Sequence, residues 1–190
     1  MDLIIKKIRN NIFLSYTVLF IVIFFCAIGS LFIVFKKTFV WEFDGVTQIV
    51  PSFLTYFHWW REFLNNIIHG NFSFPMYDLT IGLGNDLFIY NPLNIFYLPF
   101  IFWPDKHIEL LIEILTVLKM YLAGISFIFF IRYKTNLKTN ILVGSLIYIF
   151  SCSCINSFIQ FAFCENFILF PLLFYGLEKN KKKNRLNRFF

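Results

Sequence analysis

Five apolar runs divide the chain, and polar or turn-rich stretches separate them. The first run, Ile12–Phe35, contains no charged side chain. The others are Leu87–Trp103, Leu110–Ile131, Ile141–Ser157 and Phe161–Leu177. A helix needs about 20 mostly apolar residues to cross the hydrocarbon core of a bilayer. The pattern therefore predicts an all-α integral membrane protein, a polytopic bundle of helices.

A secretory signal peptide is the alternative reading of the first run. The apolar region of such a peptide has roughly 7–15 residues, with small residues at the cleavage site that follows. Ile12–Phe35 is longer, and Lys36-Lys37-Thr38-Phe39 follows it. We therefore expect an uncleaved membrane anchor.

The segment Ser52–His69 alternates apolar and polar positions with a helical period. Pro51 suits the start of such a helix and Gly70 suits its end. The expected apolar face consists of Phe53, Tyr56, Phe57, Trp60, Phe63, Leu64, Ile67 and Ile68. No soluble core is evident for this face to cover, so we expect a helix that lies in the membrane interface.

Positive charge decides how many runs cross the membrane, because cytoplasmic loops are enriched in Lys and Arg. If Leu87–Trp103 spans, the basic loop Arg132–Lys138 falls outside. If Leu87–Trp103 is re-entrant or interfacial, as its Asn91-Pro92 interruption also favours, 12 of the 17 Lys and Arg residues lie inside. We therefore predict four spans: Ile12–Phe35, Leu110–Ile131, Ile141–Ser157 and Phe161–Leu177.

This topology predicts a multi-pass plasma-membrane protein with both termini in the cytoplasm. Residues 1–11 form the cytoplasmic N-terminus, residues 12–178 form the membrane region with an external segment at 36–108, and residues 179–190 form a basic tail. Hydrophobic residues make up 58% of the chain and charged residues 15%, which excludes an ordinary soluble domain. Because orientation explains the net charge of +6, nucleic-acid binding has no support.

Metal and cofactor chemistry also lack a sequence signal. The cysteines have no zinc-ligand spacing with histidine, and we expect them to be small apolar fillers. Phosphate-loop, serine-hydrolase and zinc-protease motifs do not occur in the sequence. We therefore expect no metal and no cofactor.

Three ionisable residues call for an explanation. Lys119 lies about 20 Å along a helix from Arg132, in the outer third of the bilayer. It either binds a lipid phosphate, pairs with a carboxylate, or extends to the outer surface. Asp44 and Glu165 are external carboxylates, each close to a span. Each alone suggests only a loop or turn carboxylate, but together they suit general-base and orienting roles.

Several short motifs, in order along the chain, resemble the YfhO family of bacterial membrane proteins. The first is Asp44-Gly45-Val46-Thr47-Gln48 with Pro51 and Phe53. It is followed by the turn Gly82-Leu83-Gly84-Asn85, and then by Tyr90, Pro92 and Asn94, with Asn91 in place of the usual Ser. Lys119 with Leu122-Ala123-Gly124 and Phe127 comes next. The last is Glu165 with Pro171-Leu172-Leu173 and Gly176-Leu177-Glu178.

The resemblance implies a GT-C type glycosyltransferase fold. It implies transfer of a sugar from a polyprenyl-phosphate donor to a cell-envelope polymer of the teichoic acid type, on the outer face. An essential acidic residue of the first external loop carries over to Asp44, and a second acidic position to Glu165, where the family has Asp. Family members are several times longer, so we expect an N-terminal fragment or a truncated reading frame, which would be inactive if it lacks part of the site.

In the resulting hypothesis, the donor enters the site from the membrane lipid of the outer leaflet. Lys119 and Arg61 hold its phosphate, and Asp44 is the base. The remaining substrate contacts fall to Gln48, Asn85, Tyr90 and Asn94. A transporter or flippase for lipid-linked sugars, with Lys119 and the interrupted Asn91-Pro92 segment, is the alternative. A non-catalytic membrane subunit is a third class.

Overall fold

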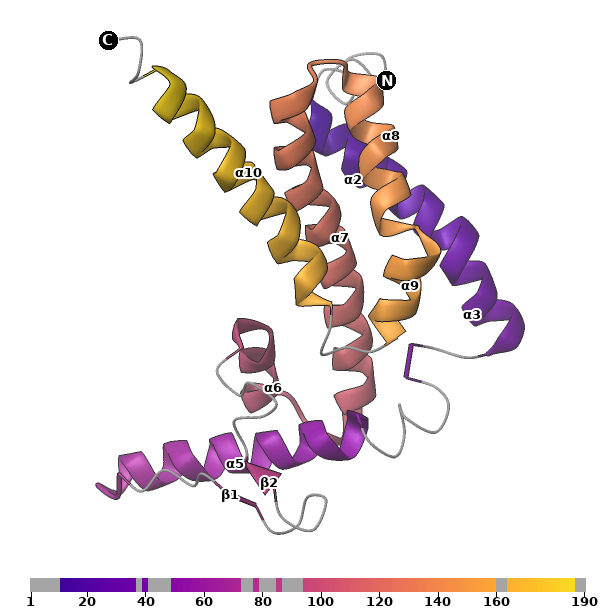
Figure 1. The fold of residues 1–190 in the computed structure, drawn as a ribbon. Coiled ribbons are helices and arrows are strands. Elements are labelled where there is room, and N and C mark those ends of the chain that lie inside the picture. Colours follow the sequence, from indigo (N-terminus) through magenta and orange to yellow (C-terminus); the bar gives the residue numbers. More distant parts are fainter. Residues whose placement is uncertain are drawn as a thin grey trace. The chain divides into compact units, whose positions relative to one another are not determined.

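The structure is a computed structural model, which describes residues 11–36, 39–40, 49–72, 77–78, 85–86, 94–159 and 164–186 (Figure 1). The chain divides into two compact units. The first unit joins Met1–Lys37 to Thr116–Phe190, and the second is Thr38–Leu115. We call them the bundle unit and the loop unit. Helix α7 (Ile108–Lys134) begins in the loop unit and continues into the bundle unit.

The first predicted span is helical throughout. It consists of α2 (Ile12–Phe24), a π-helical segment (Phe25–Gly29) and α3 (Ser30–Phe35). The Asn11 side chain caps its start, because Oδ1 accepts from the Phe13 amide at 3.0 Å. Lys36, with φ of 51°, follows its last residue in the left-handed conformation.

Two helices of the described residues are long and apolar enough to cross a membrane, Ile12–Val34 and Asp105–Lys134. The predicted third run is divided into α8 (Lys138–Ile149) and α9 (Cys152–Ile159). Ser151 accounts for the division, because its hydroxyl donates to the Tyr148 carbonyl at 2.9 Å and accepts from the Cys154 amide at 3.3 Å. Such local bonds compete with the helical ladder. The predicted count of four spans therefore stays a prediction.

The last helix, α10 (Glu165–Leu186), extends beyond the predicted end of the fourth run at Leu177. The added turns consist largely of Lys, Asn, Arg and Glu. Lys, Arg and Glu are good helix formers, so a helix continues there without apolar burial. The sequence pattern located the apolar part of this helix but not its charged continuation.

Contacts within the bundle unit fix the directions of its helices. Phe13 of α2 lies against Phe129 of α7, and Thr17 bonds to Tyr121, so these two helices are antiparallel. Lys119 pairs with Glu165, and Lys134 pairs with Glu178, so α7 and α10 are parallel. The start of α2, the α7–α8 connection and the charged part of α10 therefore share one end of this unit. This arrangement agrees with the expected topology, whereas the side of the membrane stays a prediction.

A close contact between α2 and α7 depends on a glycine. Tyr16 is fully buried, and its hydroxyl donates to the Tyr121 carbonyl at 3.1 Å. A Cβ added to Gly124 would collide with the Tyr16 hydroxyl and ring. Small residues permit such approaches between membrane helices. Gly124 is therefore required by packing.

The loop unit is built on α5 (Val50–Ile68), which confirms the predicted amphipathic helix within two residues. Its partners are a 3₁₀ turn (Ile95–Tyr97) and the one-turn helix α6 (Leu98–Phe102). Two two-residue strands, β1 (Tyr77–Asp78) and β2 (Asn85–Asp86), pair antiparallel. Otherwise the described elements are helical, as expected.

Aromatic side chains form the core between α5 and α6. Phe100 stacks on Phe53 at 4.8 Å between ring centroids, and lies 5.1 Å from Phe57. The predicted apolar face of α5 needs correction at three positions, one of which is Leu64, exposed at 36% although the pattern included it. Trp59 is buried although the pattern omitted it, whereas Ile68 is 80% exposed although the pattern included it. The ring contacts of Trp59 include Trp60 and Phe63 of the same helix, and contacts of α6 with α5 extend from Phe53 to Arg61, short of Ile68.

Candidate functional site

A buried ion pair joins α7 to α10 in the bundle unit. The Lys119 side chain is fully buried, and its Nζ lies 2.5 Å from the Glu165 Oε1. The Glu165 side chain is 15% exposed. Thr116 and Met120, on the same helix as Lys119, are also fully buried. The pair therefore lies inside the helix packing rather than on its surface.

The burial of Lys119 bears on the three roles that the sequence left open for its side chain. Extension to the outer surface is wrong for this structure, because the side chain has no exposed area. Pairing with a carboxylate is what the structure shows. An ionised group inside a membrane protein is costly, and such groups commonly mark binding or transport sites. We therefore take the Lys119–Glu165 pair as the candidate site.

Glu165 reaches Lys119 because α10 begins there, and a proline shapes the start of this helix. Pro171 lies inside α10 and has no amide hydrogen, so it leaves the Phe167 carbonyl without its helical donor. The Tyr148 hydroxyl of α8 donates to this carbonyl at 3.0 Å. The Ser126 hydroxyl lies 3.5 Å away, but its stronger bond is to the Ala123 carbonyl at 2.7 Å. Side chains of two neighbouring helices thus hold the first turn of α10.

The role of Tyr148 was not predicted from the sequence. A usable signal exists, because a proline inside a predicted apolar helix frees the carbonyl four residues before it. Which side chain satisfies that carbonyl depends on the packing of α8 against α10. A tertiary structure is needed to name it.

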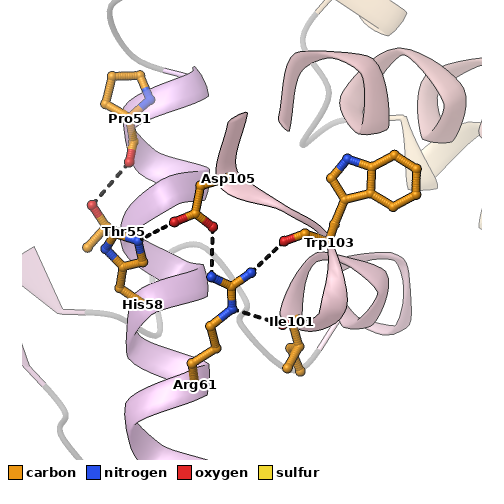
Figure 2. Close-up of polar contacts among 7 residues, drawn as sticks. All are labelled: Pro51, Thr55, His58, Arg61, Ile101, Trp103 and Asp105. Atoms are coloured by element: carbon orange, nitrogen blue, oxygen red, sulfur yellow. Dashed lines mark hydrogen bonds and ion pairs between the residues drawn. The ribbon is translucent and has the colours of Figure 1, made fainter. Parts of the chain in front are cut away.

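A second polar cluster lies in the loop unit, where Arg61 of α5 binds the segment that leads into α7 (Figure 2). Its Nε donates to the Ile101 carbonyl at 2.9 Å, and Nη2 donates to the Trp103 carbonyl. Nη1 donates to Asp105 Oδ1 at 2.7 Å. The planar guanidinium satisfies three acceptors at once, which a lysine cannot do. These contacts indicate a structural role for Arg61, and its predicted role in phosphate binding stays a prediction.

Asp105 is held from two positions of α5. Nε2 of His58 lies 2.9 Å from Asp105 Oδ2, while Arg61 contacts the other oxygen. The hydrogen bond from His58, followed by the bond and charge of Arg61, lowers the pKa of Asp105 below its ordinary value. All three side chains are more than a third exposed, so water screens these charges. We call these residues the His58–Arg61–Asp105 cluster.

The other predicted site residues are only partly described. Asp44, Gln48 and Tyr90 lie outside the described residues, so their roles stay predictions. The backbone of Asn85 pairs with Asp78 between the two short strands. Asn94 caps the 3₁₀ turn, because its Oδ1 accepts from the Phe96 amide at 2.9 Å. The predicted roles of Asn85 and Asn94 in substrate binding stay predictions.

The described residues contain no group of three or more His, Cys, Asp and Glu side chains that could hold a metal ion. Cys154 and Cys164 are buried, and Cys26 is exposed.

The fold and the buried ion pair define a helical membrane protein with an ionisable site inside its bundle. The family model described as bacterial membrane protein YfhO matches residues 12–190. The chain therefore belongs to the YfhO family. Neither the curated proteins nor the solved structures contain a match.

Proposed function

We propose that this chain carries the donor-binding part of a GT-C type membrane glycosyltransferase. In this proposal, a polyprenyl-phosphate-linked sugar is the donor, and a cell-envelope polymer of the teichoic acid type is the acceptor. Transfer takes place at the outer face of the plasma membrane. The observation that carries the proposal is the buried Lys119–Glu165 pair, at the end of the bundle unit opposite the start of α2 and the Lys134–Glu178 pair.

The chemistry assigns one step to each group. An acceptor hydroxyl attacks the anomeric carbon, and Asp44 accepts the hydroxyl proton. The bond between the anomeric carbon and the phosphate oxygen breaks, and polyprenyl phosphate leaves with the electron pair. Lys119 stabilises the negative charge of that phosphate. A single displacement inverts the configuration of the sugar.

Deletion of the gene in the bacterium that encodes this chain tests the proposal. We expect the envelope polymer to lose a sugar and the pool of polyprenyl-linked sugar to rise, with both restored by the full chain. Asp44→Asn and Lys119→Met should fail to restore the sugar at equal protein levels in the membrane. Glu178→Gln, which removes a second ion pair between α7 and α10, should restore it. An unchanged polymer in the deletion strain would contradict the proposal.

A transporter for lipid-linked sugars is the second candidate, and the interruption between α8 and α9 favours it. Interrupted helices line the substrate sites of many transporters. The two candidates differ in where the lipid-linked sugar accumulates after deletion. Loss of transfer leaves it accessible in the outer leaflet, whereas loss of transport confines it to the inner leaflet. A membrane-impermeant oxidant of sugar diols, applied to intact protoplasts, distinguishes these outcomes.

A further inference from the structure

We propose that Glu165 is the resident counter-ion of Lys119, which the phosphate of a lipid donor displaces when it binds. Glu165 is then a positioning residue rather than a second catalytic acid. This inference rests on the proposed function and specifies how the phosphate site is kept and opened.

The positive charge of Lys119 has to be balanced inside the folded protein. The Lys119 side chain is fully buried, and removing the partner of a buried charge is strongly destabilising. The ammonium therefore needs an anion whether or not a donor is bound. Glu165 supplies that anion in this structure. A phosphate can occupy the same position only if the carboxylate leaves it.

Glu165 is partly exposed, so its carboxylate can move away from Lys119. Glu165 is the first residue of α10, and its side chain retains some contact with the surroundings of the bundle unit. A small displacement of the first turn would bring the carboxylate into water, where its charge is hydrated. Lys119 lies in the middle of α7 and lacks such a route. The exchange therefore moves the glutamate and leaves the lysine in place.

The loss of one backbone hydrogen bond makes the first turn of α10 easier to displace. In the interior of a helix, each turn is tied to the next by hydrogen bonds four residues apart. Pro171 removes the bond to the Phe167 carbonyl, and the Tyr148 hydroxyl takes its place. The first turn of α10 is thus held in part by side-chain contacts, at a point where the helical ladder is interrupted. Proline positions of this kind are common sites of bending.

The experiment measures binding of a long-chain prenyl phosphate to the full chain in nanodiscs, with the neutral prenol as control. If Glu165 competes with the phosphate, Glu165→Gln should bind the prenyl phosphate about tenfold more tightly than the parent, since a charged contact no longer has to be broken. Glu178→Gln is the matched control, because it removes a partly exposed ion pair between the same two helices. It should bind like the parent, and Lys119→Met should lose binding.

Hydrogen exchange on the parent chain supplies a test that needs no variant. Prenyl phosphate should increase exchange at the amides of Asn166–Phe170, whereas prenol should not. Lys119-dependent binding that is unchanged or weaker in Glu165→Gln, or that leaves exchange at these amides unchanged, would overturn the counter-ion role while leaving the phosphate site intact. Binding that is independent of Lys119 would remove the phosphate contact of the proposed function. Sugar transfer is not measured in either assay, so the two proposals fail separately.

Discussion

The hydroxyl of Tyr148 donates to the carbonyl of Phe167, the one acceptor in α10 that Pro171 deprives of its helical amide. A residue on one helix thus repairs a defect in another. Unpaired carbonyls are costly within a bilayer, where water is absent. The bond explains how α10 tolerates a proline close to the candidate site.

Replacement of Tyr148 by Phe should therefore destabilise the bundle unit by about 1–2 kcal/mol. Unfolding of the full chain in mixed micelles measures the change. The control is a double-mutant cycle with Pro171→Ala, which restores the backbone donor to Phe167. The loss caused by Tyr148→Phe should shrink in that background. Strictly additive effects would mean that the hydroxyl does not compensate for the proline.

Gly124 should not tolerate a methyl group. Gly124→Ala places a Cβ against the ring of Tyr16, and overpacking of this kind costs about 1–3 kcal/mol. Gly144 and Gly176 are helical controls, because an added Cβ meets only an ordinary contact at 3.6 Å or nothing within 4 Å. Alanine at these two positions should be neutral or stabilising. Equal effects at all three glycines would contradict the packing role of Gly124.

Arg61 should resist replacement by Lys. Its guanidinium satisfies two backbone carbonyls and Asp105, whereas one ammonium cannot reach all three. We expect Arg61→Lys to raise hydrogen exchange in residues 95–107, with a loss of about 1 kcal/mol because the site is partly exposed. Arg132→Lys is the control, since a cation over the Phe13 ring is retained. Unchanged exchange in Arg61→Lys would remove the structural role.

The lowered pKa of Asp105 makes the loop unit sensitive to acid. A carboxyl with a lower pKa in the folded state adds stability above its unfolded pKa, and this stability disappears as the pH falls through the folded pKa. The ordinary value is 3.8, so the loss should occur below about pH 4. All four tryptophans belong to this unit (Trp41, Trp59, Trp60 and Trp103), so intrinsic fluorescence reports on it.

Asp105→Asn should lower the stability of the loop unit at neutral pH and weaken its dependence on acid. Glu62→Gln, a carboxylate change on the same helix as His58 and Arg61, is the control. It should leave the acid transition in place. An acid transition that is identical in Asp105→Asn and the parent would show that the His58–Arg61–Asp105 cluster does not set it.

Helices were the features best predicted from the sequence. Val50–Ile68 and Ile108–Lys134 agree closely with the expected Ser52–His69 and Leu110–Ile131, because periodicity and apolar length are local properties. The division between α8 and α9 was not predicted, since the apolar run continues through it. A serine that bonds to its neighbours' backbone interrupts the helix without changing the hydropathy of the run.

The candidate site was predicted as a list of residues rather than as a geometry. Lys119 was singled out because a charge stood in an apolar run, and Glu165 because it stood at an external turn. Their contact could not be inferred from periodicity, because it joins segments that are far apart along the chain. The joint general-base and orienting role expected of Asp44 and Glu165 remains a prediction, since Asp44 lies outside the described residues.

The sequence by itself determined that this is a helical membrane protein of the YfhO family, because apolar length and ordered motifs are properties of the linear chain. It also located the charged positions that a bilayer makes costly. Only the tertiary structure decided which residues of different helices contact one another. Lys119 meets Glu165, Tyr148 meets Phe167, and Gly124 meets Tyr16, because helix packing sets side-chain distances between segments remote in sequence.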